Sequence, residues 1–180
     1  MSHSDRSDGS EPAGTGRRWG AGAGSGLVAG AAMGAVLHFG LGLMPTIGAL
    51  IGDETVLAGW AVHLFNSALF GGLFVALFDR PFFGDLRGDV GGCLSLGVIH
   101  SALLGVLTGG LLLPAAIAIE GATSLPVPTL PVPGLTTSFE FGVVIAVAHL
   151  VYGVVLGRVF AAFTLAEGAI DWLPIDPVDR

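Results

Sequence analysis

The sequence predicts an all-α membrane protein, a four-transmembrane-helix bundle built from two repeated helical hairpins. Three observations lead to this fold class. The chain is 52 % hydrophobic and only 12 % charged, with a mean hydropathy of +0.80, which is too apolar for an ordinary soluble domain. Four apolar segments each reach the roughly 20 residues that a helix needs to cross about 30 Å of hydrocarbon. Two of these segments share a sequence pattern.

The apolar segments give the boundaries of the predicted elements. The predicted spans are 22–44, 56–78, 91–114 and 139–163, within a transmembrane domain of residues 21–165. Residues 1–20 are polar and have nothing to bury, so we expect a disordered N-terminal tail. Residues 166–180 form an acidic C-terminal tail. Before the last span, the prolines between 126 and 133 forbid helix and favour an extended outer loop.

The arginines predict the orientation of the spans. The loops around 46–55 and 115–138 contain no basic residue. All seven arginines fall on the other side of the predicted spans: Arg6, Arg17, Arg18, Arg80, Arg87, Arg158 and Arg180. Because basic residues gather on the cytoplasmic side of a membrane, we expect a multi-pass protein of the cell membrane with both termini cytoplasmic.

The second and fourth spans indicate an internal repeat. "AVHLFNSALFGGLF" and "VAHLVYGVVLGRVF" align without gaps, matching His63 to His149 and Gly71 to Gly157. The first and third spans match more weakly, through Met44-Pro45 and Leu113-Pro114. Each half is then one hairpin, and the halves form a parallel repeat about an axis along the membrane normal. Chance similarity between Gly- and Val-rich helices is the alternative.

Small residues recur every fourth position in these spans. Residues four apart share one helix face, and such small-residue rows let membrane helices approach closely. We therefore predict helix packing through Gly22, Gly26, Gly30, Gly34, Gly71, Gly153 and Gly157.

Each span also carries one histidine: His38, His63, His100 and His149. Polar groups inside a span face other helices or a cavity, so we expect all four imidazoles to point into the bundle. There they are candidate ligands of a haem or a metal ion. By depth, His38 pairs with His63, and His100 with His149. The expected polar neighbours are Asn66, Ser67, Thr108 and Tyr152.

Three functional interpretations remain open. The preferred one is a non-enzymatic membrane protein, a scaffold or accessory subunit whose histidines only form hydrogen bonds between helices. The second is a redox subunit that binds haem b or a metal, and the third is a small transporter or proton relay. The sequence contains no phosphate loop, catalytic triad or paired intramembrane carboxylates, so we do not expect an enzyme.

The expected partners follow from composition. The lipid bilayer is the first, with other membrane subunits or further copies of this chain as additional partners. A net charge of −7 without any lysine gives no indication of nucleic-acid binding. It is typical of proteins from extreme halophiles.

Through the two aligned segments that contain His63-Leu64 and His149-Leu150, the chain resembles small haloarchaeal four-span membrane proteins of unassigned function. Members of this group often carry the label "histidine kinase". The resemblance covers about residues 22–163 and is strongest around His63 and His149. It implies the same membrane topology but no activity. A chain of 180 residues with four spans has no room for an ATP-binding kinase domain, so we do not expect kinase activity.

Overall fold

The computed structural model describes residues 14–112, 115 and 139–170, with side chains from residue 16 to 165 within these ranges. Four helices in this part of the chain are long and apolar enough to cross a membrane, and it contains no strand. The predicted all-α four-helix class is confirmed. The prolines at 126–133, the outer loop around them and both distal tails (1–13 and 171–180) lie outside the described residues.

The first hairpin consists of α1 (Gly14–Leu41) and α3 (Val56–Phe78), joined through the short helix α2 (Met44–Ala49). The second consists of α5 (Val90–Leu104), which continues as the π-helix η2 (Gly105–Leu112), and of α7 (Phe139–Ile170). A turn η1 (Pro81–Phe83) and a short helix α4 (Gly84–Arg87) connect the hairpins. The sequence thus folds as two repeated hairpins.

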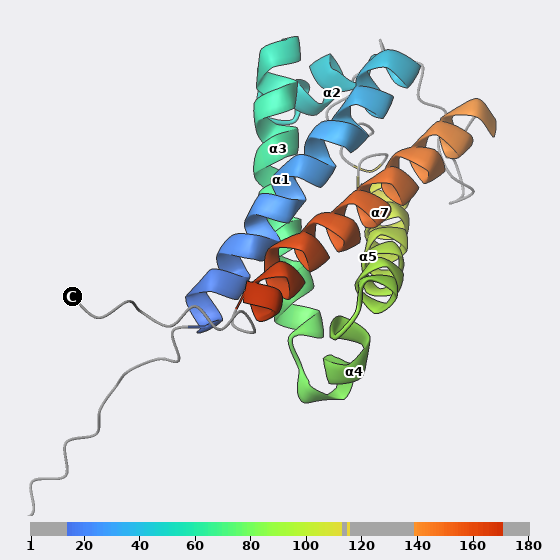
Figure 1. Cartoon of the computed structure of the whole chain (residues 1–180). Helices are drawn as coiled ribbons and strands as arrows, with labels where there is room; N and C mark the ends of the chain where they lie inside the picture. The colour runs from blue at the N-terminus through green and yellow to red at the C-terminus, as the bar shows by residue number, and fades with distance from the viewer. Residues whose placement is uncertain (1–13, 113–114, 116–138, 171–180) are drawn as a thin grey trace, which may run out of the picture.

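The two hairpins join through α1 and α7. These helices pack along each other, with α3 behind α1 and α5 behind α7 (Figure 1). By contrast, α3 and α5 touch at only a few positions. An exact twofold axis would make the α1–α7 and α3–α5 contacts equivalent, so the bundle departs from the expected symmetry. The aromatic ring of Phe74 fills the arginine-rich half of the α3–α5 interface, with centroids 5.6 Å from His100 and 5.1 Å from Phe160.

Helix boundaries agree with expectation at α3 and differ at α1 and α7. The first span ends at Leu41 rather than Met44 because Gly42 adopts a left-handed conformation, φ 61°. The Gly42 N–H then donates to the His38 carbonyl, which is the bond of an αL helix end, and the Leu43 N–H donates to the Leu37 carbonyl. Helix α1 begins eight residues before the predicted span, inside the predicted tail, and α7 runs to Ile170.

Side chains cap the starts of α3 and α5. The Thr55 hydroxyl accepts from the Ala58 N–H (3.1 Å), and the Asp89 carboxylate accepts from the Gly92 N–H (2.9 Å). These bonds satisfy N–H groups that have no partner within the helix.

Glycines allow the two helices of each hairpin to touch backbone to backbone. A Cβ at Gly26 would overlap the Ser67 carbonyl, and a Cβ at Gly97 would overlap that of Gly153. Gly22, Gly30 and Gly71 are equally close to the facing helix in the first hairpin, as are Gly153 and Gly157 in the second. The predicted packing rows therefore lie at the helix contacts.

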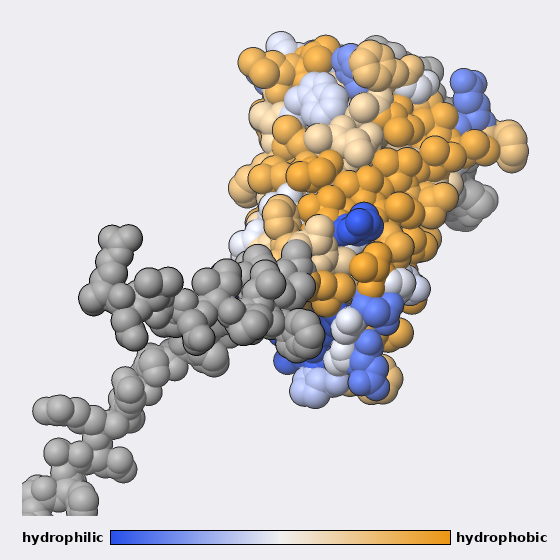
Figure 2. Space-filling model, viewed as in Figure 1, coloured by the Kyte–Doolittle hydropathy of each residue, from blue (hydrophilic) through white to orange (hydrophobic). Residues whose placement is uncertain are grey.

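The surface has the polarity expected of an integral membrane protein. A broad hydrophobic belt separates hydrophilic groups at the two ends (Figure 2). Large apolar side chains are exposed along the helices, for example Leu57 at 80 % and Phe65 at 64 %. At one end, here called the arginine end, Asp79 forms ion pairs with both Arg18 and Arg87. The opposite end carries α2 and is called the α2 end.

Candidate functional site

A cavity of about 310 Å³ lies between the two hairpins, in the half of the bundle nearer the α2 end. It occupies the space where α3 and the α5–η2 helix separate. Six lining residues are polar: His63, Asn66, Ser67, Thr108, His149 and Tyr152. The others are apolar or glycine, among them Leu37, Phe70 and Leu104. None of the described lining residues is charged, so this part of the chain forms an apolar chamber with a few polar groups.

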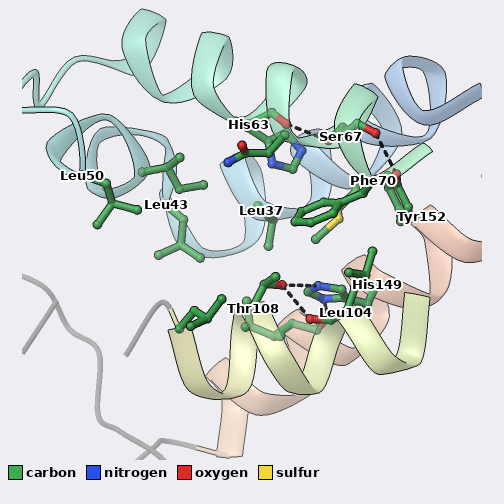
Figure 3. Close-up of a pocket in the computed structure, with 16 residues that line it drawn as sticks. Leu37, Leu43, Leu50, His63, Ser67, Phe70, Leu104, Thr108, His149 and Tyr152 are labelled. Carbon is green, nitrogen blue, oxygen red and sulfur yellow. Dashed lines mark hydrogen bonds between the residues drawn. The ribbon is translucent and has the colours of Figure 1, made fainter. Parts of the chain in front are cut away.

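His63 belongs to the α3 wall of the cavity (Figure 3). Its ring lies against Gly34 of α1, where an added Cβ would be 3.0 Å from Cδ2. Its Nε2 is 2.9 Å from the Gly30 carbonyl oxygen, which can only accept, so Nε2 carries the hydrogen. In the neutral ring, Nδ1 is then a hydrogen-bond acceptor. No described residue forms a hydrogen bond with it.

His149 lies on the opposite wall, at the equivalent place in the second hairpin (Figure 3). Its ring lies against Gly105, where an added Cβ would be 3.0 Å from Cγ. Its Nδ1 donates to the Ile145 carbonyl oxygen at 2.9 Å, which leaves Nε2 as the acceptor. The nearest polar atom to Nε2 is the hydroxyl oxygen of Thr108, at 3.4 Å.

The cavity hydroxyls bond to backbone carbonyls. Thr108 donates to Leu104 (2.7 Å), and Ser67 donates to the carbonyl of His63 (2.7 Å). Tyr152 of α7 donates to the Ser67 carbonyl of α3 at 2.9 Å, a direct hydrogen bond between the hairpins. Asn66 is exposed and has no hydrogen bond to a described residue, so the expected network with His63 does not form.

The other two histidines lie outside this cavity. His38 is near the α2 end of α1, where its ring centroid is 6.1 Å from that of Trp60. His100 lies toward the arginine end and bonds the Phe70 carbonyl across the α3–α5 interface at 3.0 Å. Neither His38 nor His100 shares the cavity, and the span histidines that do are His63 and His149.

A haem held by two imidazoles fits one wall better than the other. His149 has the arrangement of an oriented ligand, because a carbonyl holds Nδ1 and leaves Nε2 available. His63 has the reverse arrangement, since its Nε2 already donates to Gly30. Within the described part of the chain, no three His, Cys, Asp or Glu side chains lie close enough together to share a metal ion.

Sequence reasoning missed the glycines that seat the imidazoles. The small-residue rows of the first and third spans include Gly34, Ser101, Gly105 and Gly109, but only as helix-packing residues. Gly34 and Gly105 occupy corresponding positions opposite His63 and His149, and this correspondence is the signal that could have found them. The Ser101 hydroxyl donates to the His149 carbonyl and ties α5 to α7.

Comparison of the chain with family models, with curated protein sequences and with solved structures finds no match.

Proposed function

We propose that this protein is a non-enzymatic integral membrane component that binds one small apolar molecule in the cavity between its hairpins. One observation supports the proposal above all: the chamber of about 310 Å³ has apolar walls and six polar side chains. Ligand sites are typically concave, mainly apolar and about 300–1,000 Å³ in volume, with a few polar groups that orient the ligand. The cavity is at the small end of this range, which favours a single-ring molecule.

The hydrogen bonds favour binding over catalysis. A nucleophilic hydroxyl needs a base that takes its hydrogen. The Ser67 hydroxyl donates to the backbone of His63 rather than to the ring, and the Thr108 hydroxyl donates to Leu104. Among the lining residues that the structure describes there is no carboxylate, so they give a proton relay no acidic group.

An accessory role follows from the same features. A four-helix protein that binds a ligand without converting it acts through a partner, either another membrane subunit or a further copy of the chain. Blue-native electrophoresis of protein solubilised in mild detergent tests this role, and a species heavier than one chain is the expected result.

Haem b is the second candidate, because His149 is held in the orientation of an axial ligand. When bound, haem would supply one-electron redox chemistry. The absorption spectrum of the purified protein tests this alternative. A Soret band that is lost in His149→Ala would establish haem binding and replace the small-molecule proposal.

The small-molecule proposal is tested by titrating the protein in lipid nanodiscs with 4-propylphenol, followed by calorimetry. We expect saturable binding of one molecule per chain. Ile47→Trp places a large ring on the cavity wall and should abolish binding. The control is Leu57→Trp, on the exposed face of α3, which should bind like the unmodified chain. Binding that survives Ile47→Trp, or no saturable binding at all, contradicts the proposal.

A further inference from the structure

The hydroxyl and imidazole hydrogens around the cavity are all donated to backbone carbonyls. His63 donates to Gly30, and His149 donates to Ile145. The hydroxyls of Ser67, Thr108 and Tyr152 donate to the carbonyls of His63, Leu104 and Ser67 respectively. Each hydroxyl or neutral imidazole has one hydrogen to give. These five side chains therefore present only acceptor atoms to a ligand.

The pair formed by His149 and Thr108 is the sharpest example. Nε2 of His149 and the Thr108 hydroxyl oxygen are 3.4 Å apart. Thr108 directs its single hydroxyl hydrogen to the closer Leu104 carbonyl at 2.7 Å, and His149 donates its own hydrogen to Ile145. The alternative tautomer of His149 does not resolve this, since it would set the Nδ1 lone pair against the Ile145 carbonyl at 2.9 Å. Two acceptors at this distance need a hydrogen from outside the pair.

A second proton on His149 would supply that hydrogen at a high cost. The imidazolium would be a charge in a chamber where the described lining residues include no carboxylate. Placing an unpaired charge within a membrane span costs several kcal/mol. A neutral hydrogen-bond donor avoids this cost.

We infer that the cavity selects a neutral molecule with an apolar body and a hydroxyl group, an alcohol or a phenol, whose hydroxyl donates to Nε2 of His149 and the Thr108 oxygen. The inference rests on the proposed function, because it names the ligand class of the same cavity. The uncharged lining disfavours a cationic amine for the reason that disfavours imidazolium. A ligand with acceptors only, such as a ketone or an ether, would bring a third acceptor to the pair. Such ligands gain no hydrogen bond at this pair and should bind more weakly than the matching alcohol or phenol.

The test compares 4-propylphenol with its methyl ether, 4-propylanisole, by calorimetry in nanodiscs. The two probes share the ring and the alkyl chain, and only the phenol can donate a hydrogen bond. We expect the phenol to bind about tenfold more tightly, the effect of one well-placed hydrogen bond. In His149→Phe, which keeps a ring against Gly105, this preference should disappear.

Thr108→Val is the milder variant, because it keeps the shape and removes one acceptor, and it should reduce the preference two- to threefold. Thr164→Val is the control for this variant. The Thr164 hydroxyl donates to the Phe160 carbonyl near the arginine end, and Thr164 does not line the cavity. The preference for the phenol should therefore not change. Equal affinity for phenol and ether overturns the inference while leaving the cavity as a binding site. Failure of both probes to bind overturns the proposed function instead.

Discussion

His63 and His149 occupy equivalent places in the two hairpins, yet their rings bond different carbonyls. His63 reaches across to Gly30 of the facing helix, whereas His149 bonds Ile145 of its own helix. At the position of Gly30, the second hairpin has Ser101, whose hydroxyl joins α5 to α7 through the His149 carbonyl. The free nitrogen of the second imidazole lies 3.4 Å from the Thr108 hydroxyl oxygen.

Tyr152 provides the clearest single-residue test of how the hairpins are held together. Tyr152→Phe removes the hydrogen bond to the Ser67 carbonyl and little else, because Tyr152 is otherwise buried among apolar groups. Hydrogen bonds between membrane helices contribute about 0.6–1 kcal/mol, so we expect a loss of stability of that size. Unfolding by SDS in mixed micelles measures it. Ser67→Ala is the control: it keeps the acceptor carbonyl and should cost less, and an equal cost would contradict the assignment.

Residue patterns point to most of the polar residues of the cavity, but His38 lies outside it. All four polar neighbours and two of the four histidines line it. His38 continues the row of Gly30 and Gly34, which faces α3, so its ring meets Trp60. The cavity-facing residues of α1 are Met33 and Leu37, on the adjacent lane. A small-residue row marks where two helices touch, and a cavity opens where they do not.

At the scale of elements, the sequence predicts the apolar membrane-spanning segments well and the ends of helices α1 and α7 poorly. Helix α3 begins and ends where hydropathy predicts, bounded by the Thr55 cap and by Asp79. The end of α1 depends on the left-handed conformation of Gly42, which hydropathy does not sense. The separation of α3 from η2 depends on packing between helices far apart in sequence, so no single span predicts it.

Two glycines of α1 test the contact between α1 and α3. Gly26→Ala would drive a methyl group into the Ser67 carbonyl, with Gly71 Cα only 2.9 Å away. Overpacking of this kind costs about 1–3 kcal/mol, and here rigid backbone provides the obstacle. Gly20→Ala makes the same change one and a half turns earlier, where nothing lies within 4 Å. SDS unfolding should show the loss for Gly26→Ala and a change within about 0.5 kcal/mol for Gly20→Ala. Similar values for both would contradict the described contact.

The ion pairs of Asp79 link three elements at the arginine end. Asp79 ends α3, Arg18 lies in α1, and Arg87 ends α4. Asp79→Asn should lower the free energy of unfolding by about 1 kcal/mol, because the pairs are partly exposed to solvent. Salt should reduce this difference. SDS unfolding at low and high salt measures it, with the exposed Asp85→Asn as control. A loss that does not respond to salt would indicate packing rather than charge.

At the scale of the whole molecule, the asymmetry between the two helix interfaces creates the cavity. Helices α1 and α7 pack along each other, while α3 and α5 meet mainly around Phe74 and His100. Where α3 and α5 separate, polar side chains of both hairpins line one chamber. The repeat supplies equivalent residues, and the departure from symmetry gives them a space to share.

Charge at the two ends predicts the orientation of the molecule in the cell membrane. Arg17, Arg18, Arg80 and Arg87 lie at the arginine end, and the turn after α2 carries Asp53 and Glu54 instead. Arg158 is exposed within α7, twelve residues before the helix ends at Ile170, and its long side chain can extend toward the same side. The positive-inside rule therefore predicts that the arginine end faces the cytoplasm, together with both termini.

Cysteine labelling in intact cells tests this orientation. The native Cys93 is fully buried, so the unmodified chain should not react with a membrane-impermeant maleimide and serves as the control. Asp53→Cys places an exposed thiol at the α2 end and should react in intact cells. Asp85→Cys places an exposed thiol in α4. It should react only after permeabilisation, because one span, α3, lies between residues 53 and 85. The opposite labelling pattern would reverse the orientation, and labelling of both thiols from outside would mean that α3 does not cross the membrane.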